Sequence, residues 1–107
     1  MKRGTLCWVN LEPSHPPEFG KTRPGVVVSN SEQNAVLETV VIVPVSSQSP
    51  EIWPLRLAIH MPQGKKSFAV LPGIRQVSKR RITQTVGLLS LSELERLDEA
   101  LGVYLQD

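Results

Sequence analysis

One segment constrains the fold of this 107-residue chain most strongly: the run Thr39-Val40-Val41-Ile42-Val43 inside residues Glu38–Val45. Five β-branched side chains in a row favour a strand, because their restricted χ1 angles suit a pleated sheet better than a helix. A run without polar alternation is typical of a strand that is buried on both faces. We therefore predict a central strand over Glu38–Val45, ending at the polar stretch 46–50.

Shorter apolar segments on either side predict the other strands, and prolines and glycines separate them. The expected strands are Thr5–Asn10, Gly25–Ser29, Trp53–Ile59, Ser67–Leu71, Ile74–Val77 and Thr83–Leu88. The segment Leu11–Thr22 contains three prolines and one glycine, which indicates a long loop, and Ser31–Leu37 is interpreted as a connection. Long loops in small domains are often functional.

The C-terminal end has the pattern of a helix. Ser90 and Glu93 have the spacing of a capping box, which would satisfy two free backbone amides. An apolar stripe at helical spacing follows, formed by Leu91, Leu94, Leu97, Ala100, Leu101, Tyr104 and Leu105. Several short strands, one early loop and one final helix predict a mainly β fold, a small antiparallel barrel or a strongly bent sheet with a C-terminal helix, as a single domain over residues 1–107.

Composition excludes several classes of protein. Cys7 is the single cysteine, so no internal disulfide or cysteine cluster can form, and we expect Cys7 in or near the core. With only His15 and His60 and no carboxylate cluster, neither a metal site nor a cofactor is predicted. No run approaches the ~20 apolar residues of a membrane span, and the stretch Met1-Lys2-Arg3-Gly4 lacks the apolar character of a signal peptide, so we expect a cytoplasmic location.

Charge is distributed unevenly along the chain. Residues 1–89 carry eleven Lys and Arg against five Glu, whereas residues 90–107 carry one Arg against five acidic residues. A basic body favours polyanionic partners, although the excess is mild.

Arg23 is the strongest candidate for chemistry. Pro24 follows it and biases it toward an extended conformation, immediately before the apolar strand that starts at Gly25. A guanidinium held at the mouth of a sheet is suited to bind phosphate or carboxylate through two parallel hydrogen bonds.

The order of motifs along the chain resembles the MazF/PemK/Kid family of toxins. The resemblance rests on Lys2-Arg3-Gly4 with Trp8-Val9-Asn10-Leu11-Glu12-Pro13, Lys21-Thr22-Arg23-Pro24 with Val26-Val27-Val28-Ser29-Asn30, Val41-Ile42-Val43-Pro44-Val45-Ser46-Ser47, Ile74-Arg75-Gln76-Val77-Ser78-Lys79-Arg80-Arg81-Ile82, and Val86-Gly87-Leu88-Leu89. Each block is weak alone, but together they cover nearly the whole chain in the right order.

This resemblance implies an SH3-like barrel that acts as a homodimer and cleaves single-stranded RNA without a metal. It also implies a cognate antitoxin whose disordered, acidic segment blocks the RNA groove. The implied reaction is attack of the 2′-hydroxyl on phosphorus, giving a 2′,3′-cyclic phosphate and a 5′-hydroxyl. Arg23 would stabilise the phosphorane, and Ser46 or Ser47 would supply the hydroxyl that the family carries there. Strand alternation turns only one of the two serines toward the groove, and we expect that serine to be Ser46.

RNA contacts are expected from side chains of the long loop and of the blocks around it. The predicted RNA-binding residues are Glu18, Phe19, Lys21, Thr22, Gln48, Arg75, Gln76, Lys79 and Arg80. Lys65, Lys66 and Arg81 are further basic residues that could reach phosphates, although a charged pair such as Lys65-Lys66 is more often only solvated.

The chain departs from the family at the proposed site. Some members have an arginine and an aspartate where this chain has Val70 and Pro72, and a histidine where it has Pro17. His15 could compensate for the last change and Glu18 is a candidate base, so the general base stays open.

Two alternative functions remain. One is a binder of the same architecture, like the gyrase-poisoning toxin CcdB, and the other is an RNA-binding module that has lost catalysis.

Overall fold

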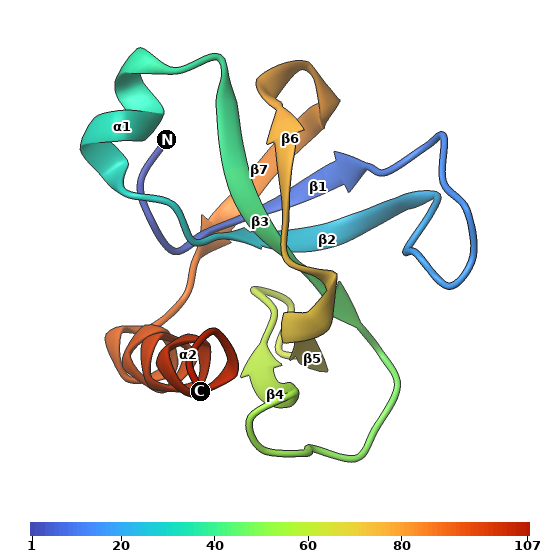
Figure 1. The fold of residues 1–107 in the computed structure, drawn as a ribbon, viewed down its shortest axis with the longest axis vertical. Helices are drawn as coiled ribbons and strands as arrows, with labels where there is room; N and C mark the ends of the chain where they lie inside the picture. The colour runs from blue at the N-terminus through green and yellow to red at the C-terminus, as the bar shows by residue number, and fades with distance from the viewer.

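The computed structural model describes residues 1–107 as seven strands, two α-helices and two short 3-10 helices (Figure 1). The strands are β1 (Thr5–Asn10), β2 (Thr22–Val27), β3 (Thr39–Ser46), β4 (Arg56–His60), β5 (Lys66–Val70), β6 (Arg75–Ser78) and β7 (Ile82–Leu88). The helices are α1 (Ser31–Val36) and α2 (Leu91–Tyr104), and the 3-10 helices are η1 (Leu71–Gly73) and η2 (Lys79–Arg81).

Strand β3 is the centre of one antiparallel sheet, whose order is β4-β5-β3-β2-β1-β7 with β6 also paired to β3. Along one edge of β3, residues Ile42–Pro44 pair with Gly25–Val27 of β2. Along the other edge, the first half of β3 pairs with β6 and the last two residues pair with β5. Because β3 changes partner midway, the sheet bends sharply around it (Figure 1). The mainly β class with a C-terminal helix is confirmed, but the hydrogen-bond ladders do not close the predicted barrel.

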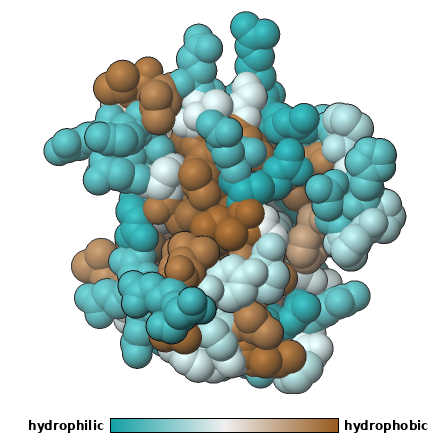
Figure 2. Space-filling view, viewed as in Figure 1, coloured by the Kyte–Doolittle hydropathy of each residue, from teal (hydrophilic) through white to brown (hydrophobic).

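The burial of β3 explains its unbroken β-branched run. Val40 and Ile42 belong to one hydrophobic cluster, whereas Val43 and Val45 belong to a second, larger cluster. Successive side chains of a strand point to opposite faces, so both faces of β3 are covered by apolar side chains. On the face seen in Figure 2, hydrophobic side chains gather near the centre and hydrophilic ones surround them.

Helix α2 covers one side of the larger cluster through Leu97, Ala100 and Leu101. The two ends of the predicted apolar stripe are not buried: Leu91 is 79 % exposed and Leu105 is 62 % exposed.

The predicted capping box of α2 is only half formed. Ser90 Oγ accepts a hydrogen bond from Glu93 N at 3.2 Å, as an N-cap should. The Glu93 carboxylate, however, accepts a hydrogen bond from His60 N at 2.8 Å, at the edge of β4. Glu93 therefore connects the start of α2 to the sheet.

Three further predictions were wrong in detail. The connection over 31–37 is helix α1, whose first amides donate to the Asn30 side chain. The second strand begins at Thr22, since its pairing with β1 continues to Asn10. The fourth strand begins only at Arg56, because Leu55 N and Arg56 N fold back onto the Ile52 carbonyl in a turn.

Cys7 lies in the core as predicted, and burial raises the pKa of its thiol to about 11. Neither α1 nor α2 combines the length and the apolar character that a helix needs to cross a membrane.

Candidate functional site

A cavity of about 490 Å³ lies where β1, β2 and the end of β3 meet the hairpin between β4 and β5. We call it the Arg23 cavity. The sheet side contributes Trp8, Lys21, Thr22, Arg23, Pro24, Val45, Ser46 and Ser47. The hairpin side contributes Met61, Gln63, Lys65 and Ser67. The structure thus brings together five residues that the sequence predicted from two separate segments: Lys21, Thr22, Arg23, Ser46 and Ser47.

Arg23 is held on one side and free on the other. It stands within β2 opposite Val9 of β1, so its backbone belongs to the sheet. Its Nε donates to the carbonyl of Gly20 at 3.0 Å, and its guanidinium carbon lies 5.0 Å from the centre of the Phe19 ring. The two terminal nitrogens have no hydrogen-bond partner within the protein. The guanidinium fork, which is suited to bind phosphate, is therefore oriented but has no protein acceptor at its terminal nitrogens.

The two serines at the end of β3 differ in their surroundings. Ser46 is only 7 % exposed, and its Oγ accepts a hydrogen bond from Gln48 N at 3.1 Å. Ser47 is exposed, yet it also borders the cavity. The Ser46 hydroxyl accepts from the backbone and donates to no group of the protein, so its proton is available to a ligand. Gln48 follows directly and its carbonyl accepts from Arg56 Nη1 at 3.2 Å, but it does not line the cavity.

The loop that precedes Arg23 has a defined root. Leu11 N donates to the carbonyl of Lys21 at 2.8 Å, which closes the loop. Lys21 has a φ of +62°, a left-handed conformation that is uncommon for a residue with a Cβ and is often found at functional sites. Arg81 Nη1 donates to the carbonyl of Asn10 at 3.1 Å and to that of Glu12.

Gly20 lies next to Lys21, at the end of the loop that leads into Arg23. A Cβ at Gly20 would meet Ser14 Oγ at 2.3 Å and Glu12 Oε1 at 2.7 Å, so a larger residue would require these two side chains to move.

A second cavity of about 570 Å³, here called the Phe19 cavity, adjoins the loop on another side. It is lined by Leu11, Pro17, Glu18, Phe19, Val70, Pro72, Gly73, Ile74 and Arg75. Three predicted RNA-binding residues, Glu18, Phe19 and Arg75, lie here and not in the Arg23 cavity. The Phe19 ring borders this cavity and also packs against the Arg23 guanidinium, so it connects the Phe19 cavity with the Arg23 cavity.

The three positions at which the chain departs from the family it resembles, Pro17, Val70 and Pro72, also line the Phe19 cavity. Arg75 is the cation among its lining residues. Glu18, the candidate base, accepts a hydrogen bond from His15 N at 2.9 Å and so also stabilises the loop.

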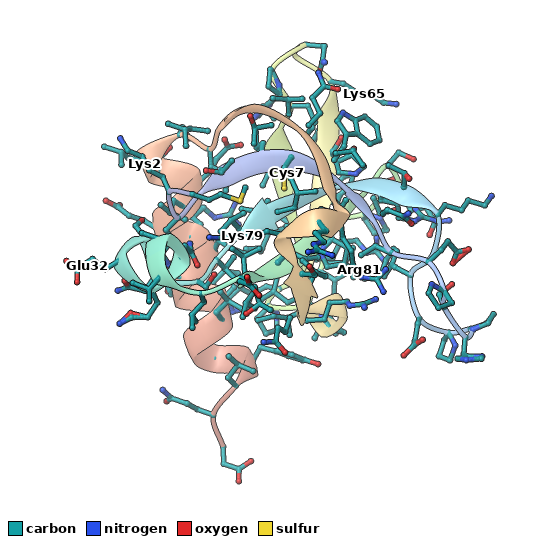
Figure 3. All side chains as sticks on the ribbon, turned by 90° about the horizontal axis from the view of Figure 1, so that it is seen from above. Lys2, Cys7, Glu32, Lys65, Lys79 and Arg81 are labelled. Carbon is teal, nitrogen blue, oxygen red and sulfur yellow. The ribbon has the colours of Figure 1, made fainter.

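The remaining predicted residues are not brought to the Arg23 cavity. Gln76 lies in β6, where its Nε2 donates to Thr39 Oγ1 at 3.0 Å, and Thr39 begins β3. Lys79 Nζ donates to the carbonyl of Asn34 in α1, and Arg80 follows it in η2. The eight residues of β3 separate this end from Ser46, a distance of about 23 Å at ~3.3 Å per residue. Figure 3 shows Lys79 beside α1 and far from Lys65 at the hairpin tip.

Trp8, Met61, Gln63 and Ser67 line the Arg23 cavity although the sequence did not indicate them. Lys65 was noticed only as half of a charged pair. A turn sequence such as Met61-Pro62-Gln63-Gly64 predicts a hairpin but not the cavity it closes. The cavity forms because β5 pairs with the end of β3, and no local sequence pattern reveals this pairing.

The Arg23 cavity is cationic. Lys21, Arg23 and Lys65 line it, and none of its lining residues is an aspartate, glutamate or histidine. Hydroxyls come from Thr22, Ser46, Ser47 and Ser67. Such a site is suited to bind a phosphate and to stabilise additional negative charge on it. Nowhere in the chain do three or more His, Cys, Asp or Glu side chains form a group that could hold a metal ion.

Comparison with protein families gives a match over residues 2–105 to the family of PemK-like, MazF-like toxins of type II toxin–antitoxin systems. The chain is 31 % identical over 113 aligned residues to the endoribonuclease MazF9 of Mycobacterium tuberculosis, covering 98 % of this chain and 96 % of that protein. It is 27 % identical to the endoribonuclease EndoA of Bacillus subtilis, covering 98 % and 94 %.

Solved structures give the same fold. MazF from Deinococcus radiodurans superposes with a TM-score of 0.84 at 23 % identity, covering 98 % of this chain and 96 % of that one. A mycobacterial endoribonuclease in complex with its cognate antitoxin superposes with a TM-score of 0.82 at 19 % identity, covering 98 % and 94 %.

Proposed function

This chain belongs to the family of PemK-like, MazF-like toxins of type II toxin–antitoxin systems, and we propose on that basis that it is a toxin that cleaves single-stranded RNA. Relatives named as endoribonucleases align over almost their entire length with this chain, which supports the RNA-cleaving activity.

The observation that carries the proposal is the pairing of Arg23 with Ser46 in one cationic cavity. The guanidinium is fixed by Gly20 and Phe19, and its terminal nitrogens are free. The Ser46 hydroxyl is fixed at a strand end and borders the same cavity. A phosphodiester bound between them would meet donors on two sides.

The reaction uses the RNA's own 2′-hydroxyl. The 2′-hydroxyl loses its proton to solvent as its oxygen attacks the adjacent phosphorus, the bond from phosphorus to the 5′-oxygen breaks, and the 5′-oxygen takes up a proton from solvent. The products are a 2′,3′-cyclic phosphate and a 5′-hydroxyl. Arg23 binds the non-bridging oxygens and stabilises the charge that develops on the phosphorane. Ser46 donates a hydrogen bond to the same group, and Ser47 and Lys21 add further contacts.

Alignment of the 2′-oxygen with the scissile bond contributes the rest of the rate enhancement. An in-line geometry for the 2′-oxygen requires that the RNA backbone be held on both sides of the scissile bond. The Phe19 cavity is suited to hold a neighbouring nucleotide, because Phe19 offers an aromatic face and Arg75 and Glu18 offer polar contacts. Thr22, which lines the Arg23 cavity, and Gln48, which follows Ser47 outside it, would contact the flanking nucleotides.

The partners follow from the same cavity and from the relatives. An acidic, disordered segment of a cognate antitoxin would compete with RNA for Lys21, Arg23 and Lys65. A related endoribonuclease has been solved in complex with its cognate antitoxin, which supports this partner. The chain acts as a homodimer in the cytoplasm, where its RNA substrate lies.

The direct test is incubation of the purified protein with a long single-stranded RNA in the presence of EDTA. We expect discrete fragments that carry cyclic phosphate at one end and a free 5′-hydroxyl at the other. Intact RNA together with inhibited DNA gyrase would support a CcdB-like binder instead. Intact RNA that is shifted on a native gel would indicate a module that binds without cleaving.

A further inference from the structure

The hairpin between β4 and β5 lines the Arg23 cavity on the other side of β3 from β2, because β3 lies between β2 and β5 in the sheet. Gly64 N donates to the carbonyl of Met61 at 2.7 Å, and Met61 N donates to the carbonyl of Lys65 at 3.0 Å. Gly64 has a φ of +83°, which suits glycine and completes this tight turn. The backbone of Lys65 is therefore fixed at the end of this turn, at the tip of the hairpin, and its flexible side chain starts from a defined position (Figure 3).

Two adjacent lysines face different surroundings at this point. Lys65 lines the Arg23 cavity together with Ser46 and Ser67. Lys66, the first residue of β5, borders a separate surface pocket with His60 and Glu93. This division follows from strand alternation, which turns successive side chains to opposite faces.

The two lysines also differ in their charge partners. Lys66 is near enough to Glu51 to contribute to the lowered pKa of that carboxyl group. Lys65 makes no salt bridge and no side-chain hydrogen bond within the protein, and no carboxylate lines its cavity. Its ammonium group is therefore an uncompensated cation in the cavity that Arg23 also lines.

We propose that Lys65 binds a backbone phosphate of the RNA in the same cavity as Arg23 and so holds the substrate against the reacting group. This role rests on the proposed function, because it assigns a second phosphate contact to the same site. A lysine acts as a point charge on a flexible stem and does not fix a phosphate in one orientation as an arginine does. Lys65 is thus a binding residue for substrate, whereas Arg23 acts on the phosphate that reacts.

The test compares Lys65→Gln with Lys66→Gln, which remove the same charge from neighbouring positions. Binding is measured by fluorescence anisotropy with a labelled single-stranded RNA that is 2′-O-methylated throughout, so that no nucleophile is present. The logarithm of affinity should fall with the logarithm of salt concentration in the wild type, and Lys65→Gln should reduce that slope by about 0.7, the contribution of one phosphate contact on a single strand. Its affinity at physiological salt should fall about two- to five-fold, as expected for an exposed charge pair. Lys66→Gln should match the wild type in both.

Cleavage of unmodified RNA provides the second measurement. Lys65→Gln should raise KM by a factor similar to the loss of affinity and leave kcat at saturating RNA unchanged, with a melting temperature equal to that of the wild type. Equal slopes for Lys65→Gln and the wild type, or equal effects of the two variants, would overturn the role of Lys65 even when the wild type cleaves normally. Failure of the wild type to cleave, with binding and the difference between the lysines intact, would instead count against the proposed function alone.

Discussion

Replacing Ser46 by alanine tests whether its hydroxyl takes part in catalysis or only stabilises the fold. The change removes the oxygen that accepts from Gln48 N at 3.1 Å, at a residue that is 7 % exposed. Gln48 is exposed and its amide can bond to water instead, so the free energy of unfolding should fall by about 0.5–1.5 kcal/mol. If the hydroxyl also donates to the phosphorane, the single-turnover cleavage rate should fall by about 10²–10³-fold.

These two effects can be separated because their sizes differ. A loss of ~1 kcal/mol leaves a domain of ordinary stability almost fully folded, so it cannot account for a hundredfold loss of rate. Ser46→Thr, which keeps the hydroxyl, should retain most of the activity. Ser47→Ala, at an exposed position, should change stability by less than ~0.5 kcal/mol and activity by less than Ser46→Ala does. The assay is cleavage of single-stranded RNA under single-turnover conditions beside a thermal melt of each variant. Equal rate losses for the two alanine variants would refute the assignment of Ser46 over Ser47.

Three predictions concern stability and the thiol. Leu97→Ala should lower the free energy of unfolding by about 2–5 kcal/mol in urea titrations, because this side chain is fully buried in the larger cluster, whereas the exposed Leu91→Ala should cost less than ~0.5 kcal/mol. Cys7 should not react with a thiol reagent at pH 8 until urea unfolds the chain, since burial raises its pKa to about 11; fast reaction of the native protein would contradict its placement. Glu51 accepts from Ala58 N at 3.1 Å and pairs with Arg96, and the first of these contacts is the main cause of its lowered pKa. Its contribution to stability is therefore present above the ordinary pKa of a glutamate and is lost as the pH falls through the lowered value, so the drop in melting temperature caused by Glu51→Gln should be largest near pH 7 and should shrink as the pH is lowered through that value.

The elements predicted correctly from the sequence are those whose pattern reflects their own burial. The run from Thr39 to Val43 gave the central strand because both faces of β3 are covered by apolar side chains. Ser90 marked the start of α2 because an N-cap is a local hydrogen bond. Helix α1 was missed because six largely polar residues show no apolar periodicity, and the Asn30 side chain is what defines its start.

The site was predicted less completely, because it depends on which strand ends meet. Arg23 and Ser46 were found from their own segments, and the pairing of β2 with β3 brings them together. Lys79 and Arg80 belong to a basic block that suggests RNA binding, but β6 pairs with the first half of β3 and places them at the opposite end from Ser46. Lys65 could not be distinguished from Lys66 until the register of β5 was known.

The central claim is that Arg23 acts directly on the phosphate that is cleaved. Its most direct test is the kcat/KM for RNA cleavage by Arg23→Ala, with Arg80→Ala as a control that removes the same charge from an exposed position in η2. We expect Arg23→Ala to lose at least about 10²–10³-fold with an unchanged fold by circular dichroism, and Arg80→Ala to stay within a few-fold of the wild type. Activity of Arg23→Ala within a few-fold of the wild type would contradict the account.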